Sequence, residues 1–140
     1  MIVEEKLNLR LAKKRVKENL TLLENTGQTI ENIFNITFIH PNFTFFNCLK
    51  NSKVKELTYS EIKQQVFNFA KYFSQNIPTP TKYVGLLLGN SPTWVSCFYG
   101  LLMSGFVPIL LSTLNSIEEN TRIMNQLKSE YLITDFKNYN

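Results

Sequence analysis

The sequence predicts an α/β fold in which helices cover a parallel sheet. Tyr83–Leu88 is a continuous apolar run, as expected of a strand that is buried on both faces. Ser91-Pro92 then favours a helix start, because serine caps helix N-termini and proline suits the first helical position. Gly105 is typical of the residue that follows a helix. Phe106–Leu111 is the next apolar run, so this stretch reads as strand, helix and strand.

The residues that follow repeat the pattern. Ser116–Glu119 forms a capping box, in which the serine side chain and the Glu119 side chain each accept a backbone amide hydrogen bond. The helix that it opens is expected to turn Ile123, Met124 and Leu127 inward. Tyr131–Thr134 is predicted to be the last strand.

The residues before the sheet predict a hairpin and a long helix. Phe43–Leu49 and Val54–Leu57 read as short strands joined by a turn at Lys50–Lys53. Thr58–Glu61 is a first capping box, and Pro78 lies beyond the end of the helix that it opens. One face of this helix is apolar, at Ile62, Val66, Phe69, Ala70 and Phe73.

The N-terminal residues predict two helices. Glu4–Glu24 is a charged helix, and Thr29 caps a second helix over Ile30–Ile39. We therefore predict a charged helical extension at 1–28, followed by a domain segment at 29–140. The first helix carries a thin apolar stripe at Leu9, Val16, Leu20 and Leu23.

Composition excludes several classes of protein. With 44% hydrophobic and 13% aromatic residues, the chain is not of the disordered class. The net charge of +4 is concentrated in a cluster near the start, which we interpret as a solvated helix face. No nucleic acid is expected as a partner, since no interleaved basic and aromatic pattern accompanies the cluster. The cluster consists of Lys13, Lys14, Arg15 and Lys17.

No metal or catalytic group is predicted in this sequence. Cys48, Cys97 and His40 do not have the spacing of metal ligands, and we expect two buried thiols in a reducing compartment. The Glu118-Glu119 pair points its carboxylates apart on a helix. Met1–Arg10 has no apolar signal-peptide region, so a cytoplasmic location is expected.

One alternative is a membrane span. Val84–Ile117 contains no charged residue, and Thr93–Leu111 is long enough to cross a bilayer, which takes about 20 residues. Such a helix would have to absorb Gly100, Gly105 and Pro108 in its second half, so the α/β reading is favoured over a small single-span membrane protein.

Several motifs, in order, resemble the adenylate-forming (AMP-binding) enzymes. Leu57–Ile62 is similar to their first core motif, and Asn90–Trp94 to the segment that follows their strand. Leu102–Leu111 is similar to the second core motif, and Ile117–Glu119 and Tyr131–Asp135 resemble the later helix and strand. The family comprises acyl-CoA synthetases, adenylation domains of peptide synthetases and luciferases, and the Val-Pro-Ile-Leu-Leu ending favours acyl- or aryl-CoA ligases.

The resemblance implies an incomplete N-terminal part of the adenylate-forming domain. The complete enzyme would use ATP, Mg²⁺ and CoA to turn a carboxylate into an acyl-adenylate and then a thioester. We expect no catalytic, cofactor-binding or metal residue in this chain, and no activity of the chain alone. The family's glycine-rich phosphate loop has no counterpart among Gly27, Gly85, Gly89, Gly100 and Gly105.

After the second core motif, the chain departs from the pattern of the family. Many CoA ligases carry an arginine after the second core motif that can meet CoA phosphate, whereas this chain has Ser112-Thr113-Leu114.

A further alternative function is a non-enzymatic half-domain that docks onto a partner chain through the sheet edge at Tyr131–Thr134. The expected partner is the remainder of the adenylation domain.

Overall fold

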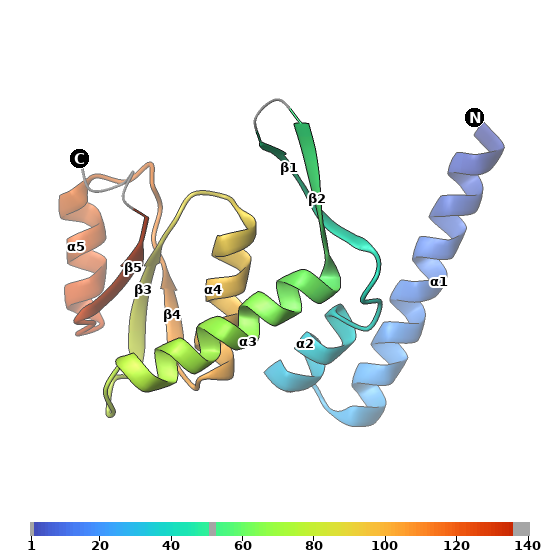
Figure 1. Cartoon of the computed structure of the whole chain (residues 1–140). Coiled ribbons are helices and arrows are strands. Elements are labelled where there is room, and N and C mark those ends of the chain that lie inside the picture. Colours follow the sequence, from blue (N-terminus) through green and yellow to red (C-terminus); the bar gives the residue numbers. More distant parts are fainter. Residues whose placement is uncertain (1, 51–52, 136–140) are drawn as a thin grey trace. The chain divides into compact units, whose positions relative to one another are not determined.

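The computed structural model describes residues 2–50 and 53–135, and the chain divides into two compact units, Met1–Ile39 and His40–Asn140 (Figure 1). Each unit is described by itself. The boundary between a charged helical extension (1–28) and a domain segment (29–140) stays a prediction.

The first unit contains α1 (Ile2–Thr26) and α2 (Ile30–Thr37). Gly27 ends α1 with a φ of +92°, a left-handed conformation that glycine adopts without steric cost. The Asn32 side chain donates to the carbonyl oxygens of Thr26 (2.8 Å) and Gly27 (2.9 Å), which fastens the start of α2 to the end of α1. Thr29 caps α2 as predicted, by accepting from the Asn32 amide.

The second unit begins with a hairpin and a long helix. β1 (Thr44–Lys50) and β2 (Lys53–Thr58) pair antiparallel, with a bulge between Thr44 and Phe46. Residues 51–52 of the predicted turn lie outside the described residues. The predicted capping box is confirmed, and it starts α3 (Tyr59–Asn76) directly at the end of β2.

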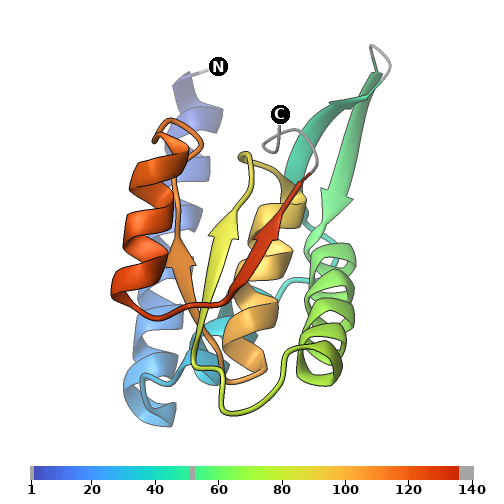
Figure 2. The same cartoon turned by 90° about the vertical axis from the view of Figure 1, so that its left-hand side faces the viewer.

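The rest of the unit is the predicted α/β step and its continuation. The order is β3 (Tyr83–Leu87), α4 (Pro92–Met103), β4 (Val107–Leu110), α5 (Ile117–Gln126) and β5 (Tyr131–Thr134). The three strands form one parallel sheet in the order β4-β3-β5 (Figure 2). The first crossover therefore places β4 on one side of β3, and the second returns past β3 to place β5 on the other side. The predicted parallel sheet with flanking helices is confirmed.

The sheet lies between α4 on one face and α5 on the other (Figure 1). Val84 and Leu86 of β3 are fully buried against α3 and α4, in one core cluster with Phe73 and Leu101. Gly100 lets the two helices approach closely, because a Cβ atom there would lie 2.9 Å from the Cβ of Phe69.

The α5 face carries a thinner apolar layer. Ile123 and Met124 are partly buried, as predicted. The expectation that Leu127 faces inward is wrong, since its side chain is 40% exposed. The physical reason is that the helix ends at Gln126, so Leu127 is the C-cap residue and no longer follows the helical spacing.

The alternative of a membrane span is not what the structure shows. Residues 93–111 are divided between α4 and β4, and Gly105 lies between them with a φ of +84°. Among residues 2–50 and 53–135, no helix is both long and apolar enough to cross a membrane.

Candidate functional site

The first family-like motif, Leu57–Ile62, joins β2 to α3. The Thr58 amide donates to Glu61 Oε2 (2.8 Å), and the Glu61 amide donates to Thr58 Oγ1 (3.2 Å). Ile62 is fully buried, and the Tyr59 ring meets Phe45 edge to face with centroids 4.7 Å apart. These side chains hold the strand–helix junction, so the motif has a structural role here.

The second family-like segment, Asn90–Trp94, turns the chain from β3 into α4. Ser91 Oγ accepts from the Trp94 amide at 3.2 Å, as predicted for an N-cap. Trp94 stacks on Phe98 at a centroid distance of 5.4 Å, and both rings pack against the core cluster. The aromatic pair therefore belongs to the packing of α4.

The third segment, Leu102–Leu111, contains the end of α4 and all of β4. Ser104 Oγ lies 2.8 Å from the Ala70 carbonyl oxygen, which ties the end of α4 to the backbone of α3. The Val107 amide donates to the carbonyl of Lys82 (2.8 Å), directly before β3, and the Leu111 amide donates to the carbonyl of Leu86 in β3 (3.1 Å). The backbone amides of odd-numbered residues in this segment thus point toward β3. Pro108 has no N–H to donate, and its even position in the edge strand of the described sheet needs none for pairing with β3.

The loop between β4 and α5 is organised around a buried asparagine. Asn120 Nδ2 donates to the Ser112 carbonyl oxygen (2.9 Å), and Asn120 Oδ1 accepts from Asn115 Nδ2 (3.2 Å). The predicted capping box of α5 is confirmed at Ser116 and Glu119. The loop presents Leu114 with its side chain 95% exposed.

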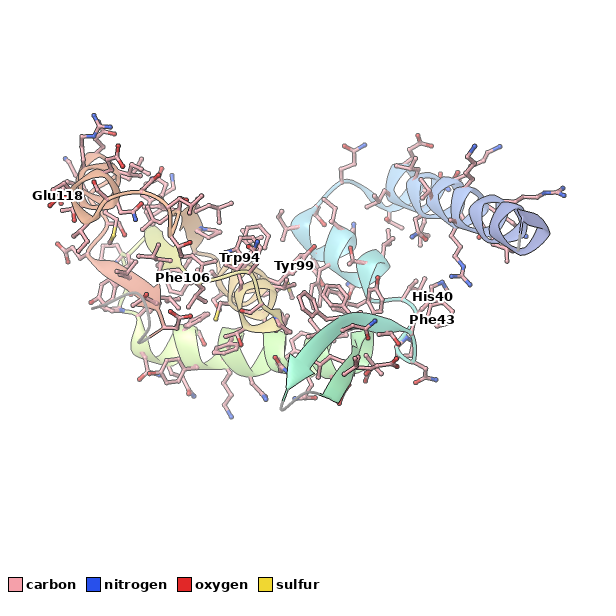
Figure 3. All side chains as sticks on the ribbon, turned by 90° about the horizontal axis from the view of Figure 1, so that it is seen from above. His40, Phe43, Trp94, Tyr99, Phe106 and Glu118 are labelled. Atoms are coloured by element: carbon pink, nitrogen blue, oxygen red, sulfur yellow. The ribbon has the colours of Figure 1, made fainter. Side chains whose placement is uncertain are left out.

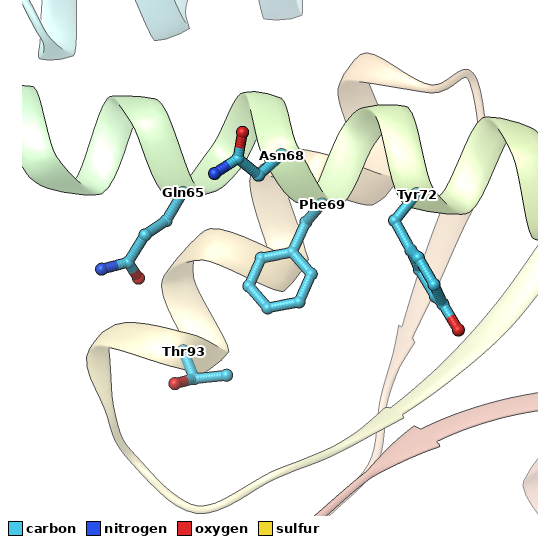
Figure 4. Close-up of a pocket in the computed structure, with 5 residues that line it drawn as sticks. All are labelled: Gln65, Asn68, Phe69, Tyr72 and Thr93. Atoms are coloured by element: carbon cyan, nitrogen blue, oxygen red, sulfur yellow. The ribbon is translucent and has the colours of Figure 1, made fainter.

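An open groove of about 430 Å³ runs between α3 and the start of α4 (Figure 4). Its lining combines two carboxamides, a phenol and a hydroxyl around one phenyl ring. At its inner edge, Gln65 Oε1 lies 3.2 Å from the hydroxyl of the fully buried Ser96. The groove can offer hydrogen bonds, but its lining holds no ionisable acid or base for proton transfer near pH 7. The lining residues are Gln65, Asn68, Phe69, Tyr72 and Thr93.

Within the described residues, the metal-ligating and nucleophilic side chains do not converge. Figure 3 shows His40 and Glu118 at opposite ends of the second unit, and the His40 ring lies 5.0 Å from that of Phe43. Burial raises the pKa of the Cys97 thiol from 9.0 to about 12, which keeps it protonated and unreactive near neutral pH. The side chain of Cys48 lies outside the described residues. No group of three metal-ligating side chains occurs in the part of the chain that the structure describes.

Polar side chains that the sequence analysis did not single out hold this architecture together. Ser96, Ser104, Asn120 and Ser129 each bond across elements, and Ser129 Oγ donates to the Tyr83 carbonyl oxygen (2.9 Å). A polar residue placed on the apolar face of a helix was the available signal for Ser96 and Asn120.

Two curated relatives share part of this sequence. A crotonobetaine/carnitine–CoA ligase of Proteus mirabilis is 27% identical over 82 residues, which are 59% of this chain and 16% of that protein. A nonribosomal peptide synthetase of Aspergillus fumigatus is 27% identical over 114 residues, which are 81% of this chain and 5% of that protein. The chain therefore spans less than a fifth of the length of either relative.

A solved structure and a family model agree with this result. A fatty acid AMP ligase from Legionella pneumophila superposes with a TM-score of 0.68 at 18% identity, over 86% of this chain and 21% of that one. That similarity shows a shared fold. The model of the family described as AMP-binding enzyme matches residues 39–140, which is more than half of the chain. This chain belongs to the AMP-binding enzyme family of adenylate-forming proteins.

Proposed function

We propose that this chain is the opening part of an adenylate-forming ligase, which activates a carboxylate with ATP and passes the acyl group to a thiol. The observation that carries the proposal is the family match over residues 39–140, in which the family-like motifs follow one another in order. CoA is the favoured acceptor, supported by the CoA ligase among the relatives. The absence of a basic side chain at Ser112-Thr113-Leu114 argues that any CoA phosphate is held elsewhere in the complete enzyme.

Within that enzyme, this chain serves as scaffold and does not catalyse alone. The family-like motifs cap helices, close turns and pack the core. ATP phosphates need clustered backbone amides and a nearby cation, and no two glycines of the sequence lie in such a loop. ATP, Mg²⁺ and CoA are therefore assigned to the complete enzyme, with the remainder of the domain as partner and the cytoplasm as location.

The partner's place is the free side of β5. β5 pairs with β3 on one side only, so within the described residues its other side offers unpaired backbone groups. The strand is short and largely apolar, with Leu132 and Ile133 partly exposed. A further strand laid beside it would extend the sheet and satisfy those groups. A second candidate function, a non-enzymatic half-domain that docks onto a partner chain, rests on this same edge.

The test is carboxylate-dependent ATP–pyrophosphate exchange. The purified chain is assayed alone and mixed with the remainder of the related CoA ligase, expressed without its matching N-terminal segment. We expect no exchange from the chain alone and exchange from the mixture. Exchange by the chain alone would overturn the scaffold role.

Hydrogen exchange separates the two candidates. Amides of Tyr131–Thr134 should become protected in the mixture, because a new strand pairs with β5. Protection without ATP–pyrophosphate exchange would favour the non-enzymatic half-domain. A mixture that shows neither protected β5 amides nor ATP–pyrophosphate exchange would contradict both candidate functions.

A further inference from the structure

Within the first unit, helix α1 presents an exposed surface that the adenylate-forming reaction does not explain. Between residues 10 and 26, most of its apolar side chains are open to solvent, with Val16 59% and Leu20 54% exposed, while Leu23 is half-buried. Soluble helices usually bury their apolar stripe against a neighbour. An exposed stripe of this kind is typical of a surface that binds another protein.

The stripe is narrow and follows helical spacing. Ala12, Val16, Leu20 and Leu23 succeed one another at intervals of four, four and three residues, so they line one side of the helix. Residues spaced in this way form the face along which a helix packs against a neighbour.

A row of cations runs beside the stripe. Arg10, Lys13 and Lys17 stand three and four residues apart, and therefore lie along one line of the helix. Among the described residues, none of these three makes an ion pair or hydrogen bond. Lys14, by contrast, pairs with Glu18 at 3.7 Å. The row is thus a positive edge beside an apolar seam, and its three cations have no ion-pair partner among the described residues.

We propose that α1 is a docking helix for an acidic amphipathic helix of a partner protein. The partner's apolar residues would pack on the stripe from Ala12 to Leu23, and its carboxylates would face Arg10, Lys13 and Lys17. Opposite charges that flank an apolar seam select both the partner and its orientation.

Other occupants fit the surface less well. A second copy paired antiparallel about Val16 would bring the two Lys17 side chains close together, and a parallel pair would set each cation row against the opposite flank of the stripe, where Arg15 lies. A membrane favours a wide apolar face, whereas Leu11 and Leu22 lie away from the stripe, and Glu18 and Glu24 would be repelled by anionic lipid.

Binding of designed probe peptides to the full chain tests the proposal. One fluorescent 21-residue helical peptide carries leucines along its seam and glutamates beside it, and a matched peptide carries lysines in place of the glutamates. We expect the acidic peptide to bind at least about tenfold more tightly than the basic one, as three exposed ion pairs allow. Raising the salt concentration should weaken this preference.

Two variants locate the surface. The triple variant Arg10→Glu/Lys13→Glu/Lys17→Glu should reverse the preference, and Val16→Asp should abolish binding of both peptides. A control with the same change in net charge, Lys71→Glu/Arg122→Glu/Lys128→Glu, should keep the preference for the acidic peptide. Circular dichroism on every variant checks that helix content is retained.

Three results would overturn the proposal. The first is equal binding, or none, of the two peptides by the unaltered chain. The second is loss of the preference in the control variant. The third is binding to vesicles of phosphatidylcholine and phosphatidylserine (7:3), or to a 20-base-pair RNA duplex, when the acidic peptide does not bind.

Discussion

The two faces of the three-stranded sheet are covered in different ways. On one face, α3 and α4 enclose Val84 and Leu86 completely, and Gly100 brings the two helices into close contact. On the other face, α5 lies over Gly85, and its side chains at Ile123 and Met124 are only partly buried. The buried residue of α5 is Asn120, which bonds to the loop after β4.

This difference indicates where the unit draws its stability. The α3–α4 face is held by close packing among apolar side chains, in which any change of volume is felt. The α5 face depends more on hydrogen bonds and on flexible side chains. We therefore expect substitutions of the same kind to cost more on the first face.

The largest difference should come from truncating a leucine of α4 and the leucine that caps the end of α5. Leu101→Ala removes a fully buried side chain and should lower the free energy of unfolding by about 3 kcal/mol, through lost burial and the cavity left behind. Leu127→Ala, at a position 40% exposed, should cost less than about 1 kcal/mol. Urea unfolding measures both, and equal losses would contradict the contrast between the faces.

Adding a methyl group should give a smaller difference. Gly100→Ala places a Cβ 2.9 Å from Phe69 Cβ and 3.3 Å from the Ala70 amide nitrogen, atoms that cannot move without the backbone, and should cost about 2 kcal/mol. Gly85→Ala meets the flexible ends of Leu132 (2.9 Å) and Met124 (3.1 Å), and should cost about 1 kcal/mol.

Gly89→Ala is the control for this pair, since nothing lies within 4 Å of its added Cβ. Urea unfolding of the three variants should rank them Gly100, Gly85 and Gly89, from the largest loss to the smallest. The reverse order for Gly100 and Gly85 would show that α5 is the more rigid cover.

On the α5 face, the main hydrogen-bonded side chain is Asn120. Asn120→Ala should lower the free energy of unfolding by roughly 1 kcal/mol, because the Ser112 carbonyl and the Asn115 amide lose their partner. Asn125→Ala, at an exposed position on the same helix, should have almost no effect. Thermal unfolding of the two variants checks this. Indistinguishable midpoints would show that the hydrogen bonds of Asn120 do not stabilise the unit.

The smallest effect on stability at neutral pH concerns Cys97. Its pKa of about 12 in the folded chain exceeds the usual 9.0, so its contribution to stability is complete below pH 9 and is lost as the pH rises toward 12. In a Cys48→Ser chain at pH 8, the lower thiolate fraction should make reaction with a disulfide reagent on the order of a thousandfold slower than in denaturant. Prompt reaction of the folded chain would show that the α4 face opens readily.

Much of the fold could be predicted from local chemistry. The capping boxes at Thr58–Glu61 and Ser116–Glu119, the Ser91 cap and the left-handed Gly105 are where the sequence places them. These features depend on a few neighbouring residues, so their signals are short-range. The prediction for Leu127 was wrong because the expected helical spacing was continued past the end of α5 at Gln126. A helix end without glycine or proline is poorly marked in the sequence.

The sequence by itself determined the alternation of strands and helices, the positions of the caps and the resemblance to adenylate-forming enzymes. Each of these features depends on short runs of residues that are close together in the chain. Only the tertiary structure decided the strand order β4-β3-β5 and the unequal cover of the two sheet faces. It also decided that Asn120 is buried while Leu114 is exposed. These outcomes depend on contacts between residues far apart in the chain, and periodicity carries no record of which distant surfaces meet.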